Sequence, residues 1–295
     1  MRFIVGFIIV GGSVLGGFTG MGGHLWVLWQ PFEILIILGA AIGSYVVANP
    51  MSVLRDTTVT IGSLLKGRRA GRTEYLELIS LIYLILRAAK SKGMNSLEKE
   101  IDNPRESQIF SQFPSVLRHE RSLRFLCDYL RLMSLGLERP HEVESLMDEE
   151  IVTLSRELNQ VPKALAGMAD GLPALGIVAA VLGVIKAMGA ISQPPEVLGQ
   201  MIGGALIGTF LGVLMSYGFV GPIAGAARQR REAELNRYIC VKVGLIAYLN
   251  GCAPQICAEH ARKVLFADVQ PSFDEVEGAT SMASLGKSRA DRQAA

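Results

Sequence analysis

The sequence has little net charge, few cysteines and few histidines, and each shortage excludes a class of function. The formal net charge of the 295 residues is only +2, which gives no support to nucleic-acid binding. Its four cysteines lack metal-ligand spacing and its four histidines are scattered. No nucleophile–base pair, phosphate loop or zinc-protease motif is present. We therefore expect no enzymatic activity, no cofactor and no metal site.

Apolar residues are abundant instead, at 50% of the chain with a mean hydropathy of +0.34. This composition indicates a membrane protein with a sizeable polar part. A helix rises about 1.5 Å per residue and the hydrocarbon core is roughly 30 Å thick, so about 20 apolar residues can span it. Four runs are long enough: Phe3–Gly20, Phe32–Asn49, Leu172–Ile191 and Met201–Gly221.

The first run predicts an uncleaved helix rather than a signal peptide, because only Arg2 precedes it and no A-x-A site follows. Trp26 and Trp29 lie in the loop after it, which predicts a position at the membrane interface. Glu33 begins the second run, where an interfacial position accounts for it better than a role in an ion path.

The basic residues predict the orientation of the chain. Residues 50–168 contain 17 of the 29 Lys and Arg, and the segment after Pro222 contains 10, whereas the loops 21–31 and 192–200 contain none. Positive charge stays on the cytoplasmic side. We expect both termini and the 50–168 insert in the cytoplasm, and both short loops on the outer side.

Within the insert, Tyr75–Leu86 is apolar but only 12 residues long, so it predicts a buried helix of a cytoplasmic bundle. Asn103 followed by Pro104 and Glu106 predicts a helix start. Residues 115–137 and 141–158 predict amphipathic helices, and residues 227–249 predict a charged continuation of the fourth span. The tail after Phe273 predicts disorder.

The expected fold is an all-α membrane protein with four transmembrane helices, a large helical cytoplasmic domain between helices 2 and 3, and a cytoplasmic C-terminal helix. The expected domains are residues 1–49 (helices 1 and 2), 50–168 (cytoplasmic helical domain), 169–222 (helices 3 and 4), 223–273 (cytoplasmic helical segment) and 274–295 (disordered tail).

Small residues recur every four positions in the last two spans: Gly204, Gly208 and Gly212 in one, and Ala179 and Gly183 in the other. Such faces let helix backbones approach closely in lipid. We therefore expect these two helices to pack against each other. The same spacing at Gly12, Gly16 and Gly20, and at Gly39 and Gly43, predicts further packing faces.

Two prolines, Pro173 and Pro222, stand at the start of the third span and the end of the fourth. Proline is ordinary at helix ends, where its missing N–H costs nothing. The alternative is a matched pair of bends that couples the membrane helices to the domain outside.

The middles of all four spans lack an ionisable residue. Lys186 lies near the outer end of its span and can snorkel, and Thr209 is the mid-span polar residue of note. If this protein uses an ion gradient, the titrating carboxylate has to come from a partner helix.

Several long motifs, in order, resemble the MotA family of membrane subunits of the bacterial flagellar stator. The resemblance runs from the first helix to about Phe273, and the energy-transducing subunits ExbB and TolQ resemble the sequence less. The motifs are GGSVLGGF, QPFEILIILGAAIGS, SLEKEIDNPRES, DYLRL, LMDEEI, LPALGIVAAVLGV, GTFLGVLMSYGF-GP and LNGCAP.

The resemblance implies a proton-conducting, torque-generating complex in the bacterial inner membrane. It implies a ring of five copies around two MotB helices, a MotB aspartate that carries the proton, and the rotor protein FliG as the receiver of torque. An energy-transducing subunit of the ExbB/TolQ kind, a sodium-driven stator and a transporter or channel acting alone remain the alternatives.

The resemblance also implies roles for individual residues. Pro173 and Pro222 would couple proton passage to a conformational change, and Ala180 and Thr209 would line the ion path. The rotor interface would contain Lys90, Glu98 and, as a weaker candidate, Glu150. At position 90 the family commonly has arginine, and lysine keeps the charge but loses the planar fork.

Overall fold

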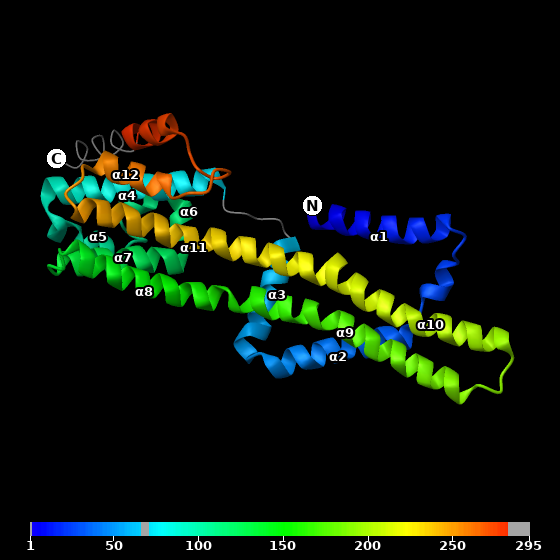
Figure 1. The fold of residues 1–295 in the computed structure, drawn as a ribbon. Helices are drawn as coiled ribbons and strands as arrows, with labels where there is room; N and C mark the ends of the chain where they lie inside the picture. Colours follow the sequence, from blue (N-terminus) through cyan, green and yellow to red (C-terminus); the bar gives the residue numbers. More distant parts are fainter. Residues whose placement is uncertain (1, 66–70, 283–295) are drawn as a thin grey trace. The chain divides into compact units, whose positions relative to one another are not determined.

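The computed structural model describes residues 2–65 and 71–282, and within these ranges the chain contains helices and no β-strand (Figure 1). Four of its helices are long and apolar enough to cross a membrane. The expected all-α membrane fold is therefore confirmed. The chain divides into two compact units: residues 1–68 with 158–231, and residues 69–157 with 232–295.

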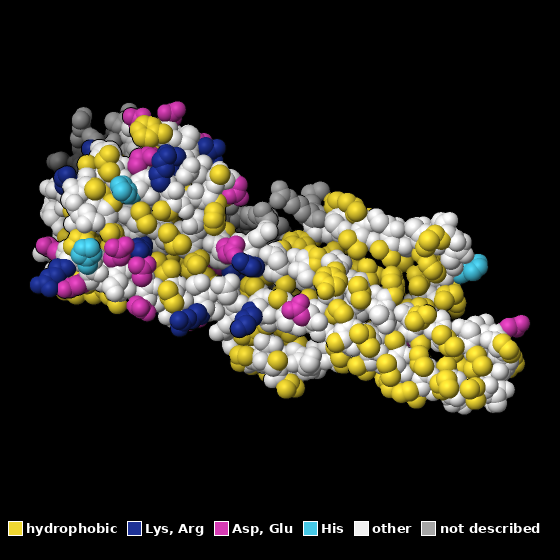
Figure 2. All heavy atoms as spheres, in the orientation of Figure 1, with side chains coloured by type: hydrophobic (Ala, Val, Ile, Leu, Met, Phe, Trp, Pro, Cys, Tyr) yellow, Lys and Arg dark blue, Asp and Glu magenta, His cyan; other side chains and the backbone are white. Residues whose placement is uncertain are grey.

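The first unit, which we call the membrane unit, has few charged side chains on the face seen in Figure 2, and hydrophobic side chains cover much of it. An ion pair of 2.7 Å between Arg231 and Asp56 holds α3 within this unit. Its elements are α1 (Arg2–Gly20), η1 (Leu25–Leu28), α2 (Pro31–Ala48), α3 (Met51–Leu65), α9 (Gln160–Gly189), α10 (Pro195–Val213), the π-helical segment η4 (Leu214–Val220) and the first part of α11 (Gly221–Leu249).

The second unit, which we call the charged unit, has Lys, Arg, Asp and Glu spread over its visible surface (Figure 2). It includes the second part of α11 and a helix over residues 273–282. Its other elements are α4 (Arg72–Lys92), η2 (Met94–Leu97), α5 (Glu98–Asp102), η3 (Phe110–Gln112), α6 (Pro114–Leu117), α7 (Glu120–Ser134), α8 (Pro140–Leu158) and α12 (Pro254–Lys263).

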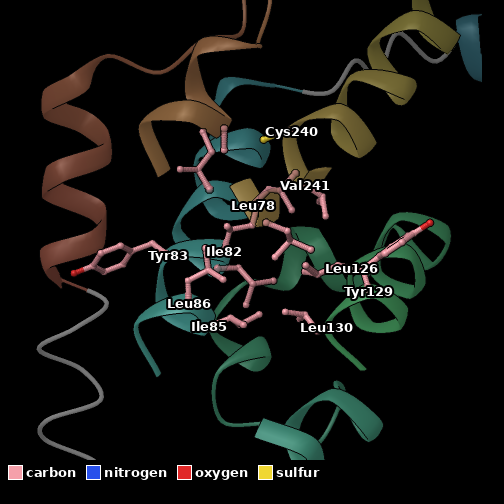
Figure 3. Packing of buried hydrophobic residues seen from close by; sticks show 14 of the residues in the cluster. Leu78, Ile82, Tyr83, Ile85, Leu86, Leu126, Tyr129, Leu130, Cys240 and Val241 are labelled. Atoms are coloured by element: carbon pink, nitrogen blue, oxygen red, sulfur yellow. The ribbon is translucent and has the colours of Figure 1, made fainter. Parts of the chain in front are cut away.

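The core of the charged unit is built around α4 (Figure 3). Every residue from Leu78 to Leu86 is buried, and the cluster includes Leu126 and Leu130 of α7 and Val241 of α11. Burying one large apolar side chain stabilises a fold by about 1.5–3 kcal/mol. The prediction that the Tyr75–Leu86 run is a buried helix is confirmed.

The predicted helix start at Asn103 is wrong. Asn103 instead follows α5 as its C-cap, with φ −123° and ψ 66°. A residue before proline is pushed out of the α region by the proline ring, and this ends the helix. The Ser107 hydroxyl then accepts hydrogen bonds from the amides of Ile109 (3.1 Å) and Phe110 (3.2 Å), which orders the next turn.

Two other boundaries differ from the prediction. The stretch 115–137 is broken into α6 and α7 at Arg118 and His119, because His119 leaves the helical region with φ −99° and ψ 70°. The predicted loop 192–200 is shorter, since α10 already begins at Pro195. Proline at the first helical position favours this start, and the acidic Glu196 in the first turn suits the helix dipole.

The prediction of disorder after Phe273 is wrong for residues 274–282, which form a helix. Ser272 and Glu275 make a capping box: the Ser272 amide donates to the Glu275 carboxylate (2.7 Å), and the Glu275 amide donates to the Ser272 hydroxyl (3.2 Å). Val276 is buried in the core of the charged unit. Residues 283–295 of the predicted tail lie outside the described residues.

Candidate functional site

Helices α9 and α10 lie side by side and antiparallel in the membrane unit (Figure 1). Their backbones approach closely: a Cβ atom built on Gly212 would lie 2.7 Å from the Leu172 carbonyl oxygen and 2.8 Å from Gly176 Cα. A Cβ atom on Gly208 would lie 3.1 Å from the Ala179 side chain. The prediction that the small residues pack these two spans together is confirmed.

The other predicted small-residue faces are open. A Cβ atom on Gly12, Gly16 or Gly20 of α1, or on Gly39 or Gly43 of α2, would meet no atom of the described chain within 4 Å. These helices therefore offer packing faces that the chain itself does not fill.

Ala180 of α9 and Thr209 of α10, the predicted ion-path residues, both lie at the contact between these two helices. A Cβ atom on Gly208 would lie 3.1 Å from the Ala180 amide nitrogen, and one on Gly176 would lie 3.3 Å from Thr209 Cα. Both side chains are half-buried at the edge of the contact between α9 and α10. The structure therefore places both residues beside the close contact of α9 and α10.

The simpler interpretation of the sequence places Pro173 and Pro222 at helix ends, but neither proline ends a helix in the structure. Pro173 lies inside α9, which begins thirteen residues earlier at Gln160. Pro222 is the second residue of α11, which continues from α10 through the π-helical segment. Proline inside a helix removes one backbone hydrogen bond and crowds the carbonyl four residues before it. Both prolines therefore interrupt the backbone hydrogen bonding of otherwise continuous helices.

The predicted rotor-interface residues, Lys90, Glu98 and Glu150, all belong to the charged unit and are exposed. Lys90 lies in the last turn of α4, and Glu98 begins α5 just after the turn at Gly93. Glu150 of α8 accepts a hydrogen bond of 2.9 Å from the Tyr129 hydroxyl. Because this contact already engages one of its oxygens, Glu150 is a weaker candidate for a partner than the other two.

Several other titratable side chains of the charged unit lie within or against its core. Glu74 accepts hydrogen bonds from Arg237 and His119, and burial, followed by the nearby Arg237 guanidinium, lowers the pKa of His119. Burial raises the pKa of the Cys127 thiol to about 12 and that of Cys257 to about 11, so both stay protonated and unreactive. Among the described residues, no group of three His, Cys, Asp or Glu could hold a metal ion.

Comparison with known proteins decides the family. The family model for the motility protein A N-terminal region matches residues 4–93, and that of the MotA/TolQ/ExbB proton channel family matches residues 119–239. The chain is 42% identical to motility protein A of Escherichia coli over 277 residues, which cover 94% of each chain. The chain belongs to the motility protein A family.

A further relative, chemotaxis protein LafT of Vibrio parahaemolyticus, is 35% identical over 94% of this chain and 97% of that protein. Two solved structures share the fold of this motility protein A family member. They are C. jejuni MotAB (TM-score 0.73, 17% identity, 90% of this chain and 96% of that chain) and the MotAB stator complex of Bacillus subtilis (TM-score 0.70, 22% identity, 90% and 97%). With four apolar helices, this family member is a multi-pass membrane protein.

Sequence reasoning missed two residues of the helix pair in this motility protein A family member. Gly176 packs closely on α10, since a Cβ atom built on it would lie 2.8 Å from the Gly208 carbonyl oxygen, and the buried Ser216 donates a hydrogen bond of 2.7 Å to the Ala169 carbonyl of α9. The signal for Ser216 was available, because it continues the four-residue series through Gly208 and Gly212. A polar residue on a small-residue face indicates a hydrogen bond across the helix pair.

The close approach at Gly212 can be tested with two matched alanine variants. We expect Gly212→Ala to destabilise the chain by about 1–3 kcal/mol, because backbone atoms of α9 occupy the space of the new methyl group. Gly203→Ala, in the same helix with nothing within 4 Å, should be neutral or stabilising, since alanine favours a helix by about 1 kcal/mol over glycine. Thermal unfolding of both variants in detergent measures the difference. Equal stability of the two would contradict the close contact.

Proposed function

We propose that this motility protein A family member is a stator subunit of the bacterial flagellar motor. With MotB it would form a proton-conducting complex that converts ion flow into torque on FliG. The observation that carries this proposal is the 42% identity to motility protein A of Escherichia coli over 94% of both chains. The two structures with the same fold are MotAB assemblies, which supports MotB as the partner.

The membrane spans support the need for such a partner. Their middles contain no Asp, Glu, Lys, Arg or His, and proton relays through a membrane use ionisable groups. A MotB aspartate would therefore carry the proton, next to Ala180 and Thr209 as lining residues. Pro173 and Pro222 would transmit its protonation to the rest of the chain.

The proposed assembly is a ring of five copies around two MotB helices in the inner membrane. The distribution of Lys and Arg supports a cytoplasmic location of both termini and of the 50–168 insert. Residues 50–168 would be the torque-generating domain, residues 1–49 and 169–222 the spans, and residues 223–273 a cytoplasmic helical segment.

Proton flux into proteoliposomes tests the proposal. We expect flux when the chain is reconstituted with MotB, and none with the chain alone or with a MotB whose membrane aspartate is replaced by asparagine. Flux through the chain alone would contradict the proposal, since it would indicate a channel with its own ion path.

Two related functions are the alternatives. The matching family model includes TolQ and ExbB, so an energy-transducing subunit for another system is the first. Copurification of the chain with a periplasm-anchored partner that lacks a peptidoglycan-binding domain would favour it. A sodium-driven stator is the second, and flux that follows a sodium gradient rather than a proton gradient would identify it.

The proposed rotor interface gives a further prediction. We expect Lys90→Glu to reduce swimming without abolishing it, because a single exposed ion pair contributes only about 0–1 kcal/mol. A charge reversal on the facing surface of the rotor should restore part of the loss. Arg156→Glu, which reverses an exposed charge on α8 of the same unit, is the control and should swim normally. Swarm diameter in soft agar measures all three strains, and failure of every rotor reversal to restore Lys90→Glu would exclude the contact.

A further inference from the structure

Pro173 leaves a backbone carbonyl of α9 without its helical partner. In an α-helix each N–H donates to the carbonyl four residues before it, so residue 173 would donate to Ala169. Proline has no N–H and cannot make this bond. Ala169 is only 5% exposed, so water cannot replace the missing donor. A buried carbonyl without a partner would destabilise the helix pair.

Ser216 supplies the missing donor from the neighbouring helix. Its hydroxyl donates a hydrogen bond of 2.7 Å to the Ala169 carbonyl, and its side chain is buried. In a helix interior, a serine hydroxyl commonly bonds a carbonyl of its own helix three or four residues back. Here it bonds the one carbonyl of α9 that Pro173 has released.

The backbone of Ser216 belongs to the interruption next to Pro222. Ser216 lies in the π-helical segment Leu214–Val220, and its carbonyl accepts the amide of Gly221, five residues on. The next residue is Pro222, which has no N–H to donate. Ser216 therefore makes a hydrogen bond at both interruptions. Its hydroxyl donates to the Ala169 carbonyl, which Pro173 leaves without a helical donor, and its carbonyl accepts the Gly221 amide in the last wide turn before Pro222.

The glycines of the helix pair permit this contact. Gly212 lies one turn before Ser216 on the same face, and its backbone approaches Leu172 and Gly176 more closely than a side chain would allow. This close approach brings a short side chain such as serine within reach of the α9 backbone.

We propose that Ser216 is a positioning residue that joins the Pro173 and Pro222 interruptions into one mechanical unit. A conformational change at one proline then moves the other through the hydrogen bond between Ser216 and Ala169. The part of this inference that concerns coupling rests on the proposed stator function. The hydrogen bond itself, and its dependence on Pro173, do not.

A double-mutant cycle on the purified complex with MotB tests the hydrogen bond. We expect Ser216→Ala to lower the folding equilibrium constant between about threefold and about twentyfold, the range of hydrogen bonds between membrane helices. In the Pro173→Ala background the same change should have no effect, because residue 173 now has an N–H for the Ala169 carbonyl. Equal losses in the two backgrounds would overturn the link to Pro173.

Three single variants keep the test decisive if the Pro173→Ala complex is poorly folded. Ser216→Thr retains the hydroxyl and should preserve stability and torque, whereas Ser216→Ala should lower both. Ser44→Ala is the control, because the Ser44 hydroxyl bonds only the Ala41 carbonyl of its own helix (3.0 Å). Equal behaviour of the alanine and threonine variants at position 216 would exclude the hydroxyl as the active group.

Torque from tethered cells separates the coupling role from a purely structural one. We expect Ser216→Ala to assemble in the membrane at the normal amount and to give less torque per stator. Normal torque together with a positive double-mutant cycle would overturn the coupling and leave only the hydrogen bond. If the wild-type chain drives no flagellar rotation, the proposed function fails, and the cycle still decides whether Ser216 compensates Pro173.

Discussion

Replacing Pro173 by alanine is expected to abolish swimming while the chain remains in the membrane. Alanine supplies an N–H at a position inside α9 where proline has none, so the helix regains the backbone hydrogen bond whose absence we propose lets α9 couple proton passage to movement. Motility in soft agar and rotation of tethered cells measure the loss, and an immunoblot of the membrane fraction measures the amount of protein.

Pro195→Ala is the matched control for this prediction. Pro195 is the first residue of α10, where the missing N–H has no helical partner to lose. We expect this variant to swim normally. Full motility of the Pro173→Ala strain would remove Pro173 from the coupling mechanism.

Replacing Arg237 by leucine is expected to lower the free energy of unfolding of the charged unit by about 3–5 kcal/mol, the usual cost of breaking a buried ion pair. The Arg237 side chain is 9% exposed, donates to Glu74, and lies 5.9 Å from the centre of the Tyr75 ring. The substitution leaves the Glu74 carboxylate in a partly buried place without this partner. Chemical denaturation followed by circular dichroism measures the change.

Arg124→Ala provides the comparison for Arg237→Leu. Arg124 pairs with Glu120 one turn earlier on α7, and the two side chains are 72% and 69% exposed. Exposed pairs of this kind contribute about 0.3–0.5 kcal/mol, so this variant should unfold almost like the wild type. If Arg237→Leu lowers the free energy of unfolding no more than Arg124→Ala does, the buried pair of Arg237 and Glu74 does not stabilise the charged unit.

The membrane spans and the buried helix α4 could be predicted from sequence because hydropathy depends on composition alone. Tyr75–Leu86 is too short to span and too apolar for a surface, which leaves a core position. The start of α9 could not be predicted in this way. Hydropathy marks where a helix enters lipid, near Leu172, whereas the helix itself begins at Gln160. Hydropathy therefore predicts Pro173 at a helix end, although it lies inside a helix.

The contact between Ser216 and Ala169 depends on the register of α10 against α9, which a single sequence does not contain. Likewise, Asn103 has the residue type of an N-cap, but the proline that follows it ends the preceding helix instead. For Ser272 and Glu275, by contrast, the sequence does contain the signal. Their spacing is that of a capping box and indicates a helix start, but the small polar residues after Phe273 favour a prediction of disorder.

The π-helical segment contains one residue more than a regular helix needs at this point, because a π-helical turn holds about one residue more than an α-helical turn. Deleting a single residue between Leu214 and Val220 would convert the wide turn into a regular α-helix and leave the later side chains of α11 on nearly the same faces. The deletion would remove the bond in which the Ser216 carbonyl accepts the Gly221 amide, five residues on. In a regular α-helix such as α1, by contrast, a one-residue deletion would turn every later side chain by about 100°.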